Sequence, residues 1–267
     1  MALDDKLLIV IDPESDNHPA RDRVVELIKL GFSKAQTEVT LLFIVDHSNT
    51  DSSASNANIF RDDKYIQDVI SPLLDIGAKP SVIISWSKDW ADSILQASES
   101  IDATSVLISH PPAESNRKLT DEFWYLIRNS SVLVDIIKTS NKPSSGKILI
   151  TMDLQDDKLS ELNERILEAG VTSAKNFGAE LHLANAYKDS SHYPDRGNIL
   201  KLTGIENDHL HIRAGEPDEV VIEVSKMLNP DMLIMGATRR RGLKATLRGR
   251  KLARMIQGVD NDTIIVV

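Results

Sequence analysis

The sequence has 267 residues, 41% hydrophobic and 27% charged, with a formal net charge of −9. This length suits two domains of common size, and the apolar content is enough for ordinary cores. The absence of cysteine excludes disulfides, thiolate nucleophiles and cysteine-based metal sites. No apolar run approaches the roughly 18 residues of a membrane helix, and acids stand where a secretory signal would carry basic residues, so we expect a cytoplasmic protein with no membrane partner.

One pattern of strands and helices is written twice along the chain. A short apolar run that ends in aspartate, "KLLIVID" at 6–12, is repeated as "GKILITMD" at 146–153. Apolar residues at helical spacing follow each run, and a second strand pattern follows each helix, at 38–45 and at 179–186. The chain is therefore predicted to be an internal duplication.

The match resumes further along, where 91–109 and 218–236 superpose without a gap as an amphipathic helix that runs into an apolar strand. Each copy then closes with a β-rich run, at 131–138 and at 263–267. Strands that alternate with helices at this spacing indicate βαβ units with right-handed crossovers. The predicted fold class is α/β, with two tandem Rossmann-like domains. Each would be a five-stranded parallel sheet of order 3-2-1-4-5 with helices on both faces.

The polar stretch at 139–147 reads as a linker, which gives domains at 1–140 and 141–267. The second copy is about fifteen residues shorter than the first between its second and third strands. We therefore expect a shortened crossover in the second domain, with room for one or two helical turns.

The ligand crevice of such a sheet lies between strands one and four, at their carboxyl ends. Those ends carry Asp12 and Ser109 in the first copy and Asp153 and Gly236 in the second. A glycine at the end of strand four and a second glycine just before a helix let the backbone approach a phosphate closely. Gly236 and Gly249 are predicted to have these two places.

The first copy has His110, Pro111 and Pro112 where glycines would be needed, and proline supplies no N–H. Its ligand site is therefore predicted to be degenerate. Asp12 fits a helix cap or turn better than a ligand contact, whereas Asp153 fits a ligand contact better than a structural role.

The two-copy layout, the strand-end aspartate, "HIRAGEPDEVV" and "LIMGATRRRGLKATLRG" resemble the universal stress protein family in its tandem form, across essentially the whole chain. The resemblance implies a stress-response protein that acts by binding rather than by turnover. Members that bind ATP share a motif of three glycines and a strand-one aspartate near the adenosine. Gly236, followed by Ala237, matches the first glycine, Gly249 the third, and Asp153 the acid.

Two positions depart from that motif, because Arg239 replaces its second glycine and Arg250 the small polar residue after the third. A backbone cradle is thus exchanged for side-chain cations. We expect weak, salt-dependent binding of ATP or another phosphate-bearing ligand in the second domain. The absence of G-x-S-x-G, H-E-x-x-H and P-loop motifs argues against an enzyme and leaves no catalytic residue to name.

The segment 239–254 holds eight Lys or Arg and no acid. It could be a solvated helix face, a phosphate contact or a nucleic-acid contact. Nucleic acid is the weakest reading, because no aromatic residue interrupts the segment to stack on bases and the whole chain is acidic.

A rival hypothesis treats the chain as an interaction scaffold without nucleotide, in which the shortened crossover exposes apolar surface for a protein partner or an apolar small molecule. The sequence leaves homodimerisation open. His209 and His211 would share one strand face, but the sequence offers no third ligand beside them, so no metal site is expected.

Overall fold

The computed structural model describes residues 6–13, 15–31, 37–45, 63–110, 119–138, 144–189, 191, 193–238 and 243–267, without the side chains of 243–248. These residues divide into two compact units, the first with the elements up to residue 138 and the second with those from residue 144. The predicted boundary at residue 140 lies outside the described residues and stays a prediction.

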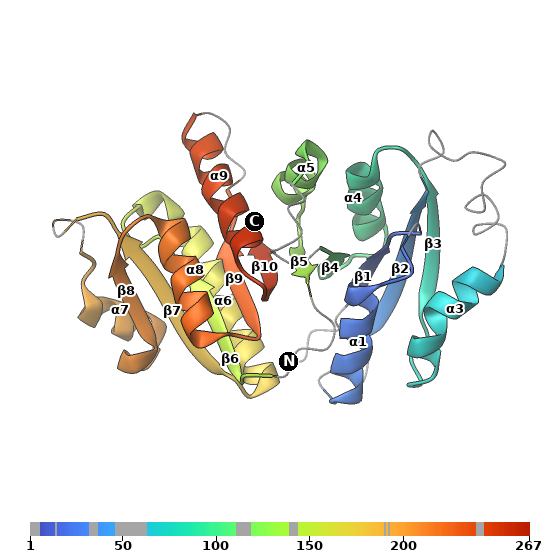
Figure 1. Ribbon diagram of the computed structural model, residues 1–267, viewed down its shortest axis with the longest axis horizontal. Coiled ribbons are helices and arrows are strands. Elements are labelled where there is room, and N and C mark those ends of the chain that lie inside the picture. The colour runs from blue at the N-terminus through green and yellow to red at the C-terminus, as the bar shows by residue number, and fades with distance from the viewer. Residues whose placement is uncertain are drawn as a thin grey trace. The chain divides into compact units, whose positions relative to one another are not determined.

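The first unit alternates strands and helices, as Figure 1 shows. In chain order its elements are β1 Lys6–Ile11, α1 Pro19–Lys29, β2 Glu38–Val45, α3 Asp63–Leu74, β3 Ser81–Trp86, α4 Trp90–Ser100, β4 Ser105–Ser109, α5 Asp121–Asn129 and β5 Leu133–Ile137. The strand order is β3-β2-β1-β4-β5, and every pair is parallel.

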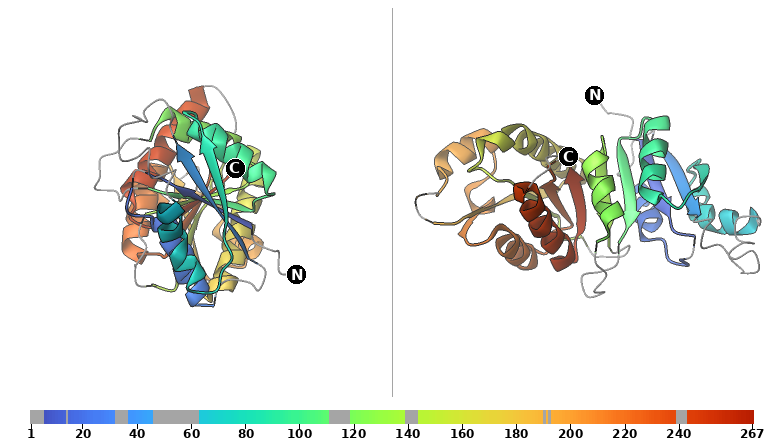
Figure 2. Two further views of the ribbon diagram at one scale, coloured as in Figure 1. Left: turned by 90° about the vertical axis from the view of Figure 1, so that its right-hand side faces the viewer. Right: turned by 90° about the horizontal axis from the view of Figure 1, so that it is seen from above.

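The second unit repeats this plan. Its elements are β6 Lys147–Thr151, the 3₁₀ turn η2 Asp157–Leu159, α6 Ser160–Phe177, β7 Glu180–Tyr187, α7 Arg196–Thr203, the 3₁₀ turn η4 Asn207–His209, β8 Leu210–Ala214, α8 Pro217–Leu228, β9 Met232–Gly236, α9 Leu243–Gly258 and β10 Asp262–Val266. The order β8-β7-β6-β9-β10 is again 3-2-1-4-5 by position in the repeat, with every pair parallel. Helices lie on both faces of each sheet (Figure 2), so the predicted fold class is confirmed.

Three backbone hydrogen bonds recur at matching positions of the two units. The pairs are Thr104 N to Lys6 O (2.9 Å) with Asp231 N to Lys147 O (2.8 Å), Ser87 N to Val45 O (3.0 Å) with Gly215 N to Tyr187 O (2.9 Å), and His110 N to Ile137 O (2.8 Å) with Ala237 N to Val266 O (2.7 Å). The repeat therefore extends beyond the hydrophobic pattern to the ends of individual strands.

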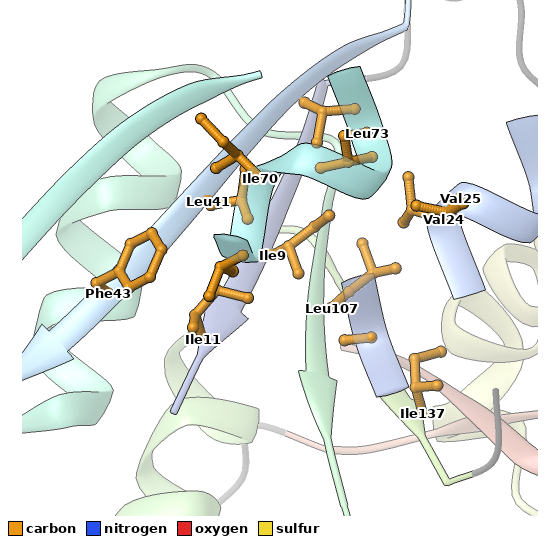
Figure 3. Packing of buried hydrophobic residues seen from close by; sticks show 13 residues of the cluster. Ile9, Ile11, Val24, Val25, Leu41, Phe43, Ile70, Leu73, Leu107 and Ile137 are labelled. Carbon is orange, nitrogen blue, oxygen red and sulfur yellow. The ribbon is translucent and has the colours of Figure 1, made fainter. Parts of the chain in front are cut away.

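The core of the first unit lies between the sheet and α1 and α3. Figure 3 shows Ile9 and Leu41 of neighbouring strands packed toward Val24 of α1 and Leu73 of α3. All four side chains are at most 1% exposed. Strands that are covered on both faces need near-continuous apolar runs, which is why "KLLIVI" and "EVTLLFIV" show little alternation.

The crossover between β7 and β8 is short. It holds the eight-residue helix α7, about two turns, where the first unit has the twelve-residue helix α3. Asp195 begins α7 by accepting a hydrogen bond from Asn198 N at 3.0 Å, and Gly204 ends it at φ 66°. These are the residue types that favour a helix start and stop, and they fix the length of the crossover.

Candidate functional site at the carboxyl edge of the second sheet

Strand order reverses between β6 and β9, which pair directly from Ile148↔Met232 to Ile150↔Ile234. Asp153 follows β6 by two residues and Gly236 is the last residue of β9. Both predicted residues therefore lie at neighbouring strand ends of one edge. Asp153 is exposed, and its Oδ1 accepts a hydrogen bond from Gln155 N at 3.3 Å.

Two buried amides that the sequence analysis did not select hold this edge together. Asn163 of α6 donates through Nδ2 to Asp153 O at 2.8 Å, and Asn185 of β7 donates through Nδ2 to Met152 O at 2.8 Å. Asn185 also accepts from Gln155 Nε2 at 2.8 Å. The signal in the sequence was an asparagine inside the apolar run "LHLANAY", because a buried amide needs partners.

Gly236 has a packing role. A Cβ at this position would lie 2.7 Å and 2.9 Å from Cδ2 and Cγ of Leu162 and 2.8 Å from Cδ1 of Ile166. Real Cβ atoms essentially never come this close to other heavy atoms. Glycine therefore lets α6 lie close to β9, and a larger residue would force these side chains or the helix to shift, whether or not a ligand approaches.

Ala237 is buried and donates its N–H to Val266 O at 2.7 Å. That amide continues the pairing of β9 with β10 and is already engaged. A phosphate at this edge would have to find another donor.

Gly249 was predicted to stand just before a helix, and this is wrong. Helix α9 begins at Leu243, so Gly249 is its seventh residue. Only the first four N–H groups of a helix lack an intrahelical acceptor, and Gly249 is beyond them. Arg250, the next residue, is exposed, whereas Arg239 lies outside the described residues.

Part of the basic segment is paired with two acids at the start of α8, Glu216 just before the helix and Asp218 within it. Lys251 Nζ lies 2.5 Å from Glu216 Oε2, and Arg254 Nε lies 2.8 Å from Asp218 Oδ2. The hydrogen bond and charge of Lys251 lower the pKa of Glu216 below its ordinary value. The Asp218 side chain is only 2% exposed, whereas Arg254 is 58% exposed. These two cations thus have a structural role, and Arg250 remains available on the surface.

The matching edge of the first unit is arranged differently. Ser109, at the position of Gly236, accepts a hydrogen bond from Ala20 N at 3.1 Å and so caps the start of α1. A shallow recess beside α4 and α5 is lined by four acids, Asp89, Asp92, Asp121 and Glu122. Asp12 is exposed, and Pro111 and Pro112 lie outside the described residues. Negative charge at this edge disfavours a phosphate.

The comparisons with known proteins agree with this fold. Residues 198–266, which span α7 to β10, match the model of the Universal stress protein family. The Universal stress protein E homolog of Haemophilus influenzae is 24% identical, over 94% of this chain and 93% of its own length. Universal stress protein E of Escherichia coli is 23% identical, over 100% of this chain and 95% of its own length.

The family match covers part of the second unit, and the relatives that align with nearly the whole chain carry the same family name at 23–24% identity. A universal stress protein of Archaeoglobus fulgidus has the same fold, with a TM-score of 0.73 at 17% identity over 98% of this chain and 96% of its own. The family match includes Gly236, Ala237, Gly249 and Arg250 and stops short of Asp153. Among the described helices, none combines the length and apolar character needed to cross a bilayer.

Proposed function

We propose that this chain is a universal stress protein that acts as a cytoplasmic binding protein. It would take ATP or another phosphate-bearing ligand weakly at the carboxyl edge of its second sheet, without turnover. Asp153 would contact the ribose, and Arg239 and Arg250 would contact the phosphates. Gly236, Ala237 and Gly249 would frame the site rather than donate to the ligand.

The strand-order reversal between β6 and β9 carries this proposal. Ligands of open α/β sheets bind outside the carboxyl ends of the strands at such a reversal, and an exposed carboxylate, Asp153, follows the end of β6. The first unit has the same reversal, but its edge presents a capped helix start and four acids. The charge of the two edges therefore favours the second unit.

We expect weak affinity because the backbone N–H groups near the site are already hydrogen-bonded within the protein or lie inside a helix. The N–H of Ala237 is bonded to Val266 O, and Gly249 lies inside α9. Phosphate would depend on side-chain cations, whose attraction in water is screened by salt. We expect a dissociation constant of about 0.1–1 mM for ATP at 50 mM salt, equivalent to roughly 4–5.5 kcal/mol.

Calorimetric titration of the full chain with Mg-ATP at 50 and 500 mM NaCl tests the proposal. We expect affinity to fall several-fold at the higher salt, and ADP and phosphate to stay undetectable after long incubation. Arg250→Gln should weaken binding about fivefold at low salt, because it removes one partly screened charge-assisted contact of about 1 kcal/mol. The loss of ATP affinity caused by Arg250→Gln should be smaller at 500 mM NaCl than at 50 mM NaCl.

Lys201→Gln is the matched control, since it removes one positive charge from an exposed position of α7. It should leave ATP affinity within twofold of the unmodified chain. Tight binding at 500 mM NaCl, or equal weakening by both substitutions, would contradict a site that contains Arg250.

A second candidate is an interaction scaffold that binds a partner or an apolar molecule at the short crossover. Its support is apolar exposure there, since Leu202 of α7 is 64% and Tyr193 is 48% exposed. Mass spectrometry of the denatured, freshly purified protein separates the two. A co-purified nucleotide favours the first candidate, and an apolar compound without nucleotide favours the second.

A further inference from the structure

Three histidines and one glutamate gather at the amino ends of β7 and β8, at the opposite edge of the sheet from Asp153. Glu180 is the first residue of β7 and His182 the third, so their side chains share one face of the strand. His211 is the second residue of β8. The sequence predicted that His209 would lie on the same strand face as His211. His209 instead ends the 3₁₀ turn η4, and its ring contacts His182. The further candidate ligands beside His209, Glu180 and His182, come from β7.

Three of these side chains, Glu180, His182 and His209, are close enough to share one ligand, and His211 contacts the His182 ring. The ring of His182 is 4.2 Å from that of His209 between centroids, and its Nδ1 is 3.2 Å from His211 Nε2. Glu180 Oε2 lies 3.5 Å from His182 Nε2. One ligand atom from each of Glu180, His182 and His209 falls within 4.8 Å of the others.

His182 Nε2 carries the strongest signal. The residue is 4% exposed, and this nitrogen is buried without a hydrogen-bond partner among the described residues. If Nδ1–H of His182 donates to His211, the lone pair on Nε2 points at a carboxylate oxygen that is also an acceptor. In that tautomer the two facing acceptors are unfavourable unless a cation lies between them, whereas in the other tautomer Nε2–H faces Glu180 as a donor.

We propose that Glu180, His182 and His209 bind a divalent transition metal, Zn²⁺ by their chemistry, and that His211 positions the His182 ring. Zinc takes imidazole nitrogen and carboxylate oxygen at about 2.0–2.2 Å, so neighbouring ligand atoms in a tetrahedral site are roughly 3.3–3.5 Å apart. The 3.5 Å separation of Glu180 and His182 already meets this geometry, and His209 would move inward slightly. Water would complete the fourth position.

The hydrogen bond between His182 and His211 is the support that metal-binding histidines usually have. A histidine ligand commonly gives its second ring N–H to a fixed acceptor, which sets its tautomer and ring orientation.

Nearby cations oppose a dication, and they limit the expected affinity. Lys147 acts on His182, and Arg196 and Arg213 act on His211. Arg213 is paired with Glu223, and Arg196 is hydrogen-bonded to Asn207, so their charges are partly engaged. Nitrogen ligands with a single carboxylate also disfavour Mg²⁺ and Ca²⁺, which prefer all-oxygen sites.

The metal would tie the end of the shortened crossover to β7. His209 lies one residue before β8, and Glu180 and His182 lie in β7, so the bound ion would join segments that the sequence separates by 27 residues or more. A ligand that binds only the folded state stabilises it by mass action. The thermal midpoint of the second unit should therefore rise with Zn²⁺.

Tag-free full-length protein, stripped with chelator and titrated with ZnCl₂ at pH 7.5, tests the site. We expect one equivalent per chain by elemental analysis and a rise in melting temperature of about 5 °C at saturating metal. Co²⁺ in place of Zn²⁺ should give the intense visible bands of a tetrahedral site. His209→Ala should weaken the binding about 100-fold and Glu180→Gln about 10-fold.

Asp208→Asn is the control, because it removes one exposed negative charge beside His209 without touching the ligands. It should keep Zn²⁺ affinity within threefold. His209 is only partly buried, so its variant stays informative even if a His182 variant fails to fold. Less than 0.2 equivalent of Zn²⁺ at 100 μM free metal, or unchanged affinity in both His209→Ala and Glu180→Gln, would overturn the proposal.

Discussion

Arg254→Ala is expected to lower the free energy of unfolding of the second unit by about 2–4 kcal/mol, because it leaves a buried carboxylate without its cation. Asp218 is 2% exposed, and its Oδ1 has no hydrogen-bond partner among the described residues. The full penalty for breaking a buried pair is reduced because Arg254 itself is half exposed. Urea denaturation followed by circular dichroism measures the loss.

The chain offers an internal reporter for this experiment. Its three tryptophans, at 86, 90 and 124, all belong to the first unit. Tryptophan fluorescence should therefore keep the same urea midpoint in Arg254→Ala, while the dichroism transition of the second unit moves to lower urea.

Two comparisons separate the Arg254–Asp218 pair from a general effect of charge. Arg250→Ala removes an exposed cation one turn earlier and should change stability by less than about 0.5 kcal/mol. When Asp218→Asn is already present, Arg254→Ala should lower the free energy of unfolding by at least about 1 kcal/mol less than it does in the unmodified chain. Equal losses from Arg250→Ala and Arg254→Ala would show that the basic helix face has no specific structural pairing.

Gly236→Ala is expected to destabilise the second unit by about 1–3 kcal/mol through overpacking against α6. The new methyl group would lie under 3.0 Å from atoms of Leu162 and Ile166, so these side chains or the helix must shift. The same urea titration measures the loss.

The shared contact with Leu162 supplies the check. Leu162→Ala makes room for the methyl group of Gly236→Ala. The decrease in unfolding free energy of the double variant should therefore be smaller, by at least about 0.5 kcal/mol, than the sum of the decreases in the two single variants. Should Gly236→Ala instead leave stability unchanged and weaken only ATP binding, Gly236 would be a ligand-approach residue and the packing account would be wrong.

Periodicity and repeats were enough to predict the fold. The strand at 38–45 matches β2 residue for residue, and the predicted helix–strand pair at 218–236 became α8 and β9. The short crossover was also readable, because Asp195 and Gly204 mark the start and end of a helix with little room between them. Each of these features depends on residues close together in the sequence.

The site was less predictable because its contacts join distant segments. The close contact at Gly236 comes from α6, about seventy residues earlier, and Arg254 is paired with Asp218 of α8, 36 residues earlier. Glycine spacing suggested a phosphate loop, but Gly249 lies inside α9, because a single glycine lowers helix propensity without having to end a helix. His182 was overlooked because a single histidine in an apolar strand gives no sign of its neighbours.

Hydrogen–deuterium exchange of the full chain with 5 mM Mg-ATP at 50 mM salt tests most directly whether the second unit alone binds the ligand. We expect slower exchange in peptides that cover 152–156 and 236–250, and no change in peptides that cover 12–18 and 109–121. Protection at the first unit's edge, or none at either edge while calorimetry records binding, would contradict this account.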